Sequence, residues 1–252
     1  MFTLLMTGGP LFDRGKQFTA ACADARRRAV HHPDTMPARN RCYPAFPDTT
    51  PLAARMETLN DTLFLWINGA VPSTAALLLG RFLANDLIYL FPLYLALNWL
   101  RADTAGREAL LQAAVSAAIA MLLSWAISKV WFHPRPFVVG LGHLHMHHAP
   151  TASFPSNHLS FVWAVCAGLA LHPARRTAAL LLALTGLPIA WARIYMGVHF
   201  PLDMAGAMLT ALAAAGIGLP LRGTLVPALR RCIEPAYRLI FAWPIRLGWA
   251  RA

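Results

Sequence analysis

Charged residues are scarce in this sequence, and acidic ones are the scarcest. Only 13% of the 252 residues are charged, whereas 57% are hydrophobic and the mean hydropathy is +0.48. Such a chain has too little polar surface to cover a water-soluble globule, so the composition indicates an integral membrane protein. The 11 acidic residues leave a net charge of +11. The basic residues are scattered between apolar runs, which argues against a nucleic-acid partner and for positions beside a membrane.

Cysteine patterns typical of metal sites or disulfide frameworks are also missing. The four cysteines, Cys22, Cys42, Cys166 and Cys232, show no CxxC spacing, so we expect neither metal ligation nor disulfides at them. A signal peptide is not predicted either, because the apolar run MFTLL is short and no basic stretch precedes it.

Three regions are predicted along the chain. Residues 1–55 mix Arg, Pro and Asp, which predicts a disordered extension. The phrase METLNDTLFLWING begins at Met56, and we hypothesise that the natural protein starts there and that the extension reflects a misassigned start. Residues 56–222 then form the folded membrane domain. The tail, residues 223–252, mixes Arg with Trp, Phe and Leu; it is predicted to be a basic amphipathic segment on the membrane surface, although a solvated tail fits equally well.

The predicted fold class is an all-α, polytopic bundle of membrane-spanning helices. A span needs roughly 20 apolar residues, and six runs approach that length: 62–80, 83–100, 108–131, 158–173, 177–196 and 202–220. Asn68 and Pro72 interrupt the first run, so the prediction is about six spans, or five if the first run lies in the interface.

Lys and Arg positions predict the orientation. If the connection 132–157 faces outward, most of the basic residues face the cytoplasm, as the positive-inside rule prefers. The outward set is then Lys129, Arg135, Arg193 and possibly Arg81. We therefore expect a membrane protein whose site faces away from the cytoplasm.

Ionisable residues gather at three places at the ends of apolar runs, where such residues are expensive and usually functional. The first cluster runs from Lys129 to Pro136. Pro134 and Pro136 are predicted to end the preceding helix and to fix the chain around Arg135. A guanidinium and an ammonium suit a phosphate dianion. The alternative is that Lys129 reaches the headgroups and Arg135 only flanks the span.

The second cluster is the run from Pro155 to His158, directly before an apolar run. Ser156 or Asn157 is predicted to be an N-cap, which places His158 in the first helical turn. Free N–H groups and the helix dipole would then favour an anion beside this imidazole. A plain capping sequence with an incidental histidine is the alternative.

The third cluster runs from Arg193 to Asp203. Pro201 suits the first position of a helix, so His199 should precede that helix and Asp203 should lie in its first turn. The carboxylate can then fix one tautomer of His199 and leave the other ring nitrogen free to attack. The alternative is a structural pair of Arg193 and Asp203. Jointly, the clusters supply the parts for phosphoryl transfer through a phosphohistidine.

These three clusters resemble the signature of the type 2 phosphatidic acid phosphatase (PAP2) superfamily, which has Lys…Arg-Pro, Pro-Ser-x-His and Arg-x5-His-x3-Asp blocks. The resemblance spans about residues 56–220 and implies the PAP2/haloperoxidase-like fold. The phrases WFHPRPFV, SFPSNH and ARIYMGVHFPLDMAG are most similar to the bacterial undecaprenyl-diphosphate phosphatases, which regenerate the C55 carrier lipid of wall synthesis.

With the predicted orientation, the resemblance implies a multi-pass protein of the bacterial cytoplasmic (inner) membrane, with its site facing the periplasm or cell exterior. The resemblance also implies roles for the matching residues. His199 would be the nucleophile, Asp203 its orienting carboxylate and His158 the proton donor to the leaving oxygen. The phosphate-binding set would be Lys129, Arg135, Arg193, Ser156 and Asn157, with no metal or cofactor required. The chain departs from the common pattern by one residue fewer between Lys129 and Arg135, by Asn157 in place of Gly, and by Ala192 in place of Ser.

Other readings remain open. A broader lipid phosphatase, acting on phosphatidate, phosphatidylglycerophosphate or lipid A, would carry the same motifs, because these motifs contact phosphate and not the lipid. An alternative that is not an enzyme is a membrane protein that binds anionic lipids without turnover. His143, His145, His147 and His148 alternate in the outward connection. Zinc binding there is the less favoured reading, because no carboxylate or cysteine lies nearby; a basic rim over the entrance is preferred. Oligomeric state is not predicted.

Overall fold

The computed structural model describes residues 51–68 and 72–251, and within these ranges every regular element is helical. The predicted all-α class is thereby confirmed. Most of the predicted extension, residues 1–50, lies outside the described residues. Residues 51–55 belong to helix α2 (Pro51–Asn68), so this helix begins before Met56.

The remaining helices follow in chain order. They are α3 (Thr74–Arg81), α4 (Leu90–Arg101), α5 (Thr104–Val130), α6 (Pro136–Val139), α7 (Asn157–Ala170), α8 (Arg176–Tyr195), α9 (Pro201–Gly218), α10 (Leu225–Ile240) and α11 (Ala242–Arg246). A π-helical turn (Phe82–Asp86) and a 3₁₀ turn (Leu87–Tyr89) join α3 to α4.

Among the described residues, four helical stretches are long and apolar enough to cross a membrane: Thr74–Arg101, Thr104–Val130, Pro173–Tyr195 and Pro201–Gly223. Helix α7 is a shorter apolar helix. Large apolar side chains such as Leu122, Leu181 and Leu209 are exposed on these stretches, as expected for surfaces that meet lipid chains. The chain is thus a multi-pass membrane protein.

The first predicted run, residues 62–80, is wrong as a single span. Helix α2 ends at Asn68 and a separate helix, α3, starts at Thr74. Asn68 is buried, and its side chain bonds to the backbone of His143 and Tyr195. A polar side chain committed to such contacts does not favour a helix continuing through hydrocarbon. The next span therefore begins at Thr74, earlier than the predicted residue 83.

The described chain divides into two compact units, each assembled from several segments. The first contains residues 51–68, 72–81, 127–154 and 191–203, and the second contains residues 82–126, 155–190 and 204–251. Helices α5, α8 and α9 each contribute to both units. The three sequence clusters are shared between the units, because the second cluster lies at the start of α7.

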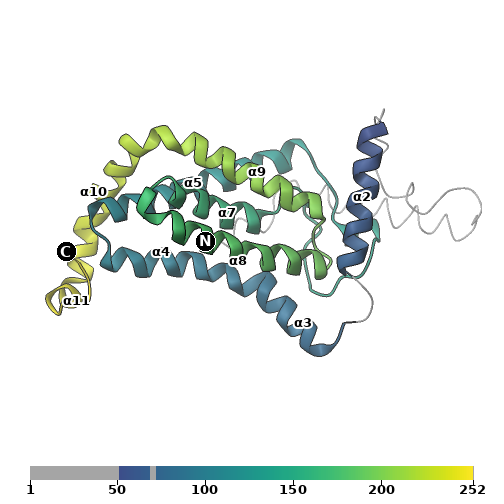
Figure 1. Ribbon diagram of the computed structural model, residues 1–252, viewed down its shortest axis with the longest axis horizontal. Coiled ribbons are helices and arrows are strands. Elements are labelled where there is room, and N and C mark those ends of the chain that lie inside the picture. The colour runs from purple at the N-terminus through teal and green to yellow at the C-terminus, as the bar shows by residue number, and fades with distance from the viewer. Residues whose placement is uncertain (1–50, 69–71, 252) are drawn as a thin grey trace, which may run out of the picture. The chain divides into compact units, whose positions relative to one another are not determined.

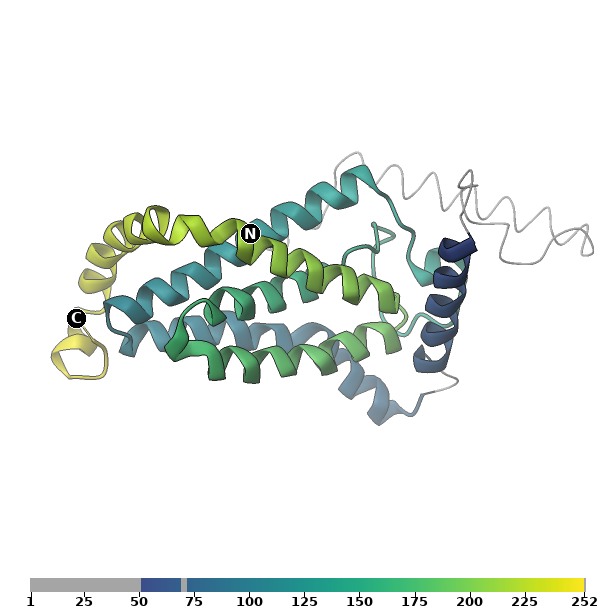
Figure 2. The ribbon, with the colours of Figure 1, turned by 45° about the horizontal axis from the view of Figure 1, so that its top comes forward.

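The second unit is a helical bundle in which α4, α5, α7, α8 and α9 run side by side (Figures 1 and 2). Small residues allow the close approach of its helices. A Cβ at Gly168 of α7 would meet the backbone of Ala113 in α5, and one at Gly186 of α8 would meet the indole of Trp163 in α7. Small residues in these helices therefore serve helix packing.

Arg107 ties the C-terminal tail to this bundle. It lies in the first part of α5 and is only 1% exposed. Its guanidinium pairs with Glu234 of α10 at 3.0 Å, donates to the Arg251 carbonyl at 2.7 Å, and lies 4.6 Å from the ring centre of Tyr237. The described part of the tail is thus packed and helical. Its contact with a membrane surface stays a prediction.

Candidate active site

His199 and Asp203 form a buried pair in the first unit. His199 Nδ1 lies 3.0 Å from Asp203 Oδ2, and the two side chains are 2% and 1% exposed. Because a carboxylate accepts hydrogen bonds, Nδ1 is the protonated ring nitrogen and Nε2 carries the lone pair. The pair therefore favours the one tautomer of the imidazole in which the lone pair lies on Nε2.

The local fold that creates this pair follows from the sequence between α8 and α9. Gly197, with φ of 80°, ends α8 in the left-handed conformation that glycine adopts readily. Pro201 then begins α9, as predicted, and Asp203 lies in its first turn. The Asp203 carboxylate also accepts the backbone N–H of Phe200 at 2.8 Å, which is the reach-back contact of a helix capping box. The spacing of His199 and Asp203 is thereby fixed by the start of the helix.

Ser153 is a contributor to this pair that the sequence analysis did not assign to the site. It is fully buried, and its hydroxyl donates to Asp203 Oδ2 through a short hydrogen bond. Its backbone N–H donates to the His133 carbonyl at 2.7 Å, which holds the residue in place. Ser153 therefore fixes the carboxylate that in turn fixes His199. Its position two residues before the second cluster was the one available signal.

Arg135 is held beside Nε2 of His199. Its Nη1 lies 3.1 Å from His199 Nε2 and donates to the Val198 carbonyl at 2.7 Å. Nε donates to the Thr151 carbonyl at 3.1 Å, and Nη2 donates to Thr151 Oγ1 at 3.1 Å and to the Ala152 carbonyl at 3.0 Å. All five N–H donors of the guanidinium thus have acceptors. This buried cation is held in one orientation, with one donor aimed at Nε2.

The prolines around Arg135 act differently from the prediction. Helix α5 ends at Val130, before Pro134 is reached, and Pro136 begins α6 with Arg135 as its N-cap residue. The preceding helix therefore ends before both prolines, and Pro136 begins a new helix, which the sequence analysis did not predict. Residues before a proline favour extended backbone, and Arg135 adopts it with φ of −77° and ψ of 158°.

Helix α2 supports the first unit from one face. Asn60 Oδ1 accepts the Leu202 N–H at 3.0 Å, which satisfies a free donor in the first turn of α9. The ring of Phe64 packs on Phe200, with centroids 5.4 Å apart. Asn68 accepts the N–H of His143 at 2.7 Å and donates to the His143 and Tyr195 carbonyls, each at 2.9 Å. Because Asn60, Phe64 and Asn68 are four residues apart, they lie on one face of α2.

Arg193, in the last turn of α8, is also buried, at 1% exposure. Its Nη2 lies 3.4 Å from His148 Nε2, and the His148 ring lies 6.5 Å from the His199 ring. Arg135, His199 and Asp203 are therefore in direct contact, and Arg193 joins them through His148. Lys129 lies in the last turn of α5, in the same unit, and is partly exposed.

The second cluster starts α7 in the other unit. Asn157 is the first residue of the helix, so His158 lies in its first turn as predicted. Ser156 is the N-cap residue, but its hydroxyl makes no capping bond. Within the described part of the chain, the buried Ser156 Oγ and Asn157 Oδ1 have no hydrogen-bond partner. Of these two atoms, only the Ser156 hydroxyl can donate a hydrogen bond, so it is the one suited to an anionic ligand at this helix N-terminus.

Burial and charge set the protonation of groups in the connection that follows α5. Burial is the main factor that lowers the pKa of Arg135 to about 10, and the carboxylate of Asp203 opposes this change; the guanidinium stays charged at neutral pH. Burial, with the charges of Arg135 and Arg193, lowers the pKa of His148 to about 3. Burial alone lowers the pKa of His133 to about 4. Both imidazoles are therefore neutral at neutral pH.

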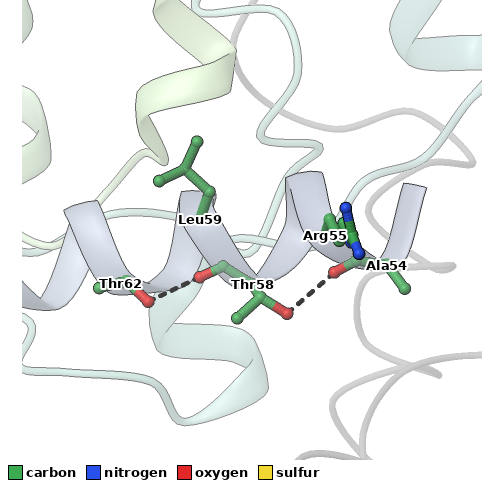
Figure 3. A pocket seen from close by; sticks show the side chains of 5 residues that line it. All are labelled: Ala54, Arg55, Thr58, Leu59 and Thr62. Atoms are coloured by element: carbon green, nitrogen blue, oxygen red, sulfur yellow. Dashed lines mark hydrogen bonds between the residues drawn. The ribbon is translucent and has the colours of Figure 1, made fainter. Parts of the chain in front are cut away.

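Metal-ligating side chains do not gather in the residues that the structure describes, where no group of three or more His, Cys, Asp or Glu is arranged to hold an ion. A shallow depression of about 430 Å³ lies on α2, lined by Ala54, Arg55, Thr58, Leu59 and Thr62 (Figure 3). The Thr58 and Thr62 hydroxyls bond to the Ala54 and Thr58 carbonyls, at 2.9 and 2.7 Å. This depression therefore offers few polar groups to a ligand.

Comparison with known proteins agrees with the geometry of the site. Residues 109–226 match the family described as the PAP2 superfamily. The chain is 36% identical over 199 residues to "Putative undecaprenyl-diphosphatase YbjG" of Escherichia coli (strain K12), covering 78% of this chain and 99% of that protein. The chain therefore belongs to the PAP2 superfamily and is a membrane phosphatase.

Two further similarities extend this result. The chain is 31% identical over 131 residues to "Undecaprenyl-diphosphatase BcrC" of Bacillus subtilis (strain 168), covering 52% of this chain and 67% of that one. Among solved structures, the crystal structure of Aquifex aeolicus LpxE is similar with a TM-score of 0.50 and 26% identity, covering 64% of this chain and 95% of LpxE. Both the sequence and the helical architecture are thus shared with the family.

Proposed function

We propose that this protein hydrolyses undecaprenyl diphosphate to undecaprenyl phosphate and inorganic phosphate, through a phosphohistidine at His199. The observation that carries the proposal is the buried bond between His199 Nδ1 and Asp203, which leaves Nε2 as the attacking nitrogen. The names of the two curated relatives support the choice of substrate. The product is the lipid carrier that is reused in wall synthesis.

In the first step, His199 Nε2 attacks the terminal phosphorus and the bond to the bridging oxygen breaks. The new N–P bond is formed by the lone pair of His199 Nε2, which accepts a hydrogen bond from Arg135 in the free enzyme. The Nη1 hydrogen is then available to an equatorial phosphate oxygen, where it stabilises the charge of the transition state. The positive charge that develops on the imidazole is stabilised by Asp203.

The leaving group in this step is undecaprenyl phosphate. His158 gives a proton to the bridging oxygen as it departs, and then takes a proton from the water that attacks the phosphohistidine. Inorganic phosphate leaves and His199 returns to its neutral form. The net reaction of the two steps is the hydrolysis of one phosphoanhydride bond.

The phosphate is held by the remaining members of the three motifs. Arg135 and Arg193 are buried cations. The free-energy cost of burying a positive charge is lowest when an anion lies beside it. The Ser156 hydroxyl and the Asn157 side chain supply further polar contacts at the start of α7, where the helix dipole favours negative charge. Lys129 is the third cation of the set. The Lys and Arg distribution of the sequence supports an outward-facing site in the cytoplasmic membrane.

A phosphate-release panel tests this function. Purified protein in detergent would be given prenyl diphosphates of C55 and C15, phosphatidate and phosphatidylglycerophosphate, all with EDTA present. We expect the prenyl diphosphates to be hydrolysed fastest, and His199→Ala to lower the rate by at least a factor of about 1,000, as expected for loss of a nucleophile.

The outcomes of the panel separate the alternatives. Faster hydrolysis of phosphatidate or phosphatidylglycerophosphate would make the protein a broader lipid phosphatase. Full activity of the His199→Ala variant would reject the proposed nucleophile. A strict requirement for added metal would reject the mechanism, and a folded protein without turnover on any lipid would favour a binding role.

A further inference from the structure

Four histidines in the connection before α7 have no assigned role in the proposed reaction, and they differ in their surroundings. His143 and His145 stack on each other, with ring centroids 6.0 Å apart, and the loop is anchored here by Asn68 and by the bond from His145 N–H to the Met196 carbonyl. His147 is exposed, whereas His148 is partly buried beside Arg193 and His199. Only His148 therefore contacts proposed site residues in the described structure.

The contacts of His148 identify its tautomer. Nδ1 lies 2.9 Å from the carbonyl of the next residue, Ala149. A carbonyl only accepts, so Nδ1 carries the hydrogen and Nε2 carries the lone pair. The guanidinium of Arg193 only donates, and its Nη2 lies 3.4 Å from that lone pair. Each ring nitrogen of a neutral His148 thus has a complementary partner.

The charges around His148 keep it in this form. Arg135 and Arg193 both face the ring, and the neighbouring His147 adds to their effect. Protonation of Nε2 would place a third positive charge beside two buried guanidinium groups and would remove the acceptor of Arg193. His148 is therefore a stable acceptor at neutral pH.

We propose that His148 is a positioning residue of the phosphate site, whose Nε2 lone pair holds the Arg193 guanidinium in the orientation that receives the substrate phosphate. This inference rests on the proposed function, because it takes Arg193 as a phosphate ligand. A guanidinium on a flexible chain loses conformational freedom when it binds. An acceptor that orients it in advance removes part of that cost.

Two amide variants distinguish the contact made by Nδ1 of His148 from the contact made by Nε2. His148→Gln places an amide oxygen near the Nε2 position, where it can accept from Arg193. His148→Asn places its amide near Nδ1, where it can donate to Ala149 but falls short of Arg193. The KM for a C15 prenyl diphosphate, kcat, and the inhibition constant of inorganic phosphate would be measured for both, with exposed His147→Asn as the control.

We expect His148→Asn to raise KM and the phosphate inhibition constant roughly tenfold, the size of one lost hydrogen bond to a charged group, with a smaller change in kcat. His148→Gln should recover most of this loss, and His147→Asn should behave as wild type. In an Arg193→Lys background, the difference between Gln and Asn at position 148 should vanish, because the two residues act as one unit.

Several results would overturn the proposal. The first is that the Gln and Asn variants have equal KM and equal phosphate inhibition constants. The second is that the Asn variant has the lower values of the two. The third is that the difference between the two variants is undiminished in the Arg193→Lys background. Melting temperatures of all variants exclude effects of folding, and His148→Leu replaces the Asn variant if that variant does not fold. The inhibition constant of inorganic phosphate can be measured with any lipid that the wild type hydrolyses. A wrong lipid assignment would therefore be recognised in the wild type, without affecting the comparison at position 148.

Discussion

Asp203 is the residue on which the geometry of the proposed nucleophile depends. Its Oδ2 accepts from His199 Nδ1, from the Phe200 N–H and from the Ser153 hydroxyl. The first two contacts follow from the sequence, because His199 and Asp203 are four residues apart at a helix start that Pro201 marks. The third depends on a residue 50 positions earlier in the chain, which no local pattern can indicate.

Ser153→Ala tests whether this third contact matters for the reaction. The change removes one donor from a buried carboxylate, so Asp203 and His199 become less well oriented. We expect kcat to fall about tenfold to a hundredfold, the range for a hydrogen bond to a charged group, while KM changes little. Steady-state kinetics on the preferred lipid would measure this.

Thr62→Ala is the matched control for that measurement, since it removes an exposed hydroxyl that bonds only within its own helix, to the Thr58 carbonyl. A Ser153→Ala enzyme with wild-type kcat would contradict the role of Ser153. A change confined to KM would contradict it as well.

At the scale of elements, the turn between α8 and α9 carries both His199 and the left-handed Gly197. A Cβ at Gly197 would run into the carbonyl of His143, so the turn and the connection before α7 approach each other closely. The helices on either side were predictable from their apolar runs and from Pro201. The close approach was not, because it joins segments distant in sequence.

Gly197→Ala should therefore destabilise the protein strongly. The left-handed conformation costs a residue with a side chain roughly 1–2 kcal/mol, and the contact with the His143 carbonyl adds to this. We expect little folded protein or a clearly lower melting temperature in detergent. Gly216→Ala in α9, where a Cβ would meet nothing within 4 Å, should change stability by no more than about 1 kcal/mol. Equal melting temperatures of the two variants would contradict this account of the turn.

Helix α2 shows what composition alone cannot decide about an element. The run 62–80 is apolar enough to suggest a span, and Asn68 and Pro72 are the features of the sequence that argue against it. The structure adds the reason: Asn60 and Asn68 bond to the start of α9 and to the end of α8. These two polar residues, eight positions apart on one face of α2, thus hold the ends of α8 and α9 in place.

At the scale of the whole molecule, the composition was sufficient for the class of protein, and the three motifs were sufficient for the family. The structure adds which motifs share a unit. The first and third motifs belong to one compact unit, with Arg135 in contact with His199, and the second motif begins α7 in the other. The roles of His148, Ser153 and Thr151 depend on three-dimensional contacts and were not predictable from the motifs.

Trapping the covalent intermediate tests the central claim most directly. The enzyme would be mixed rapidly with prenyl diphosphate labelled in its terminal phosphate, quenched in alkali to preserve phosphohistidine, and digested for mass spectrometry. We predict one labelled peptide, phosphorylated on His199, that forms and decays at rates matching turnover and is absent from His199→Ala. Label on any other residue, or full turnover with no labelled protein at any time, would contradict the account.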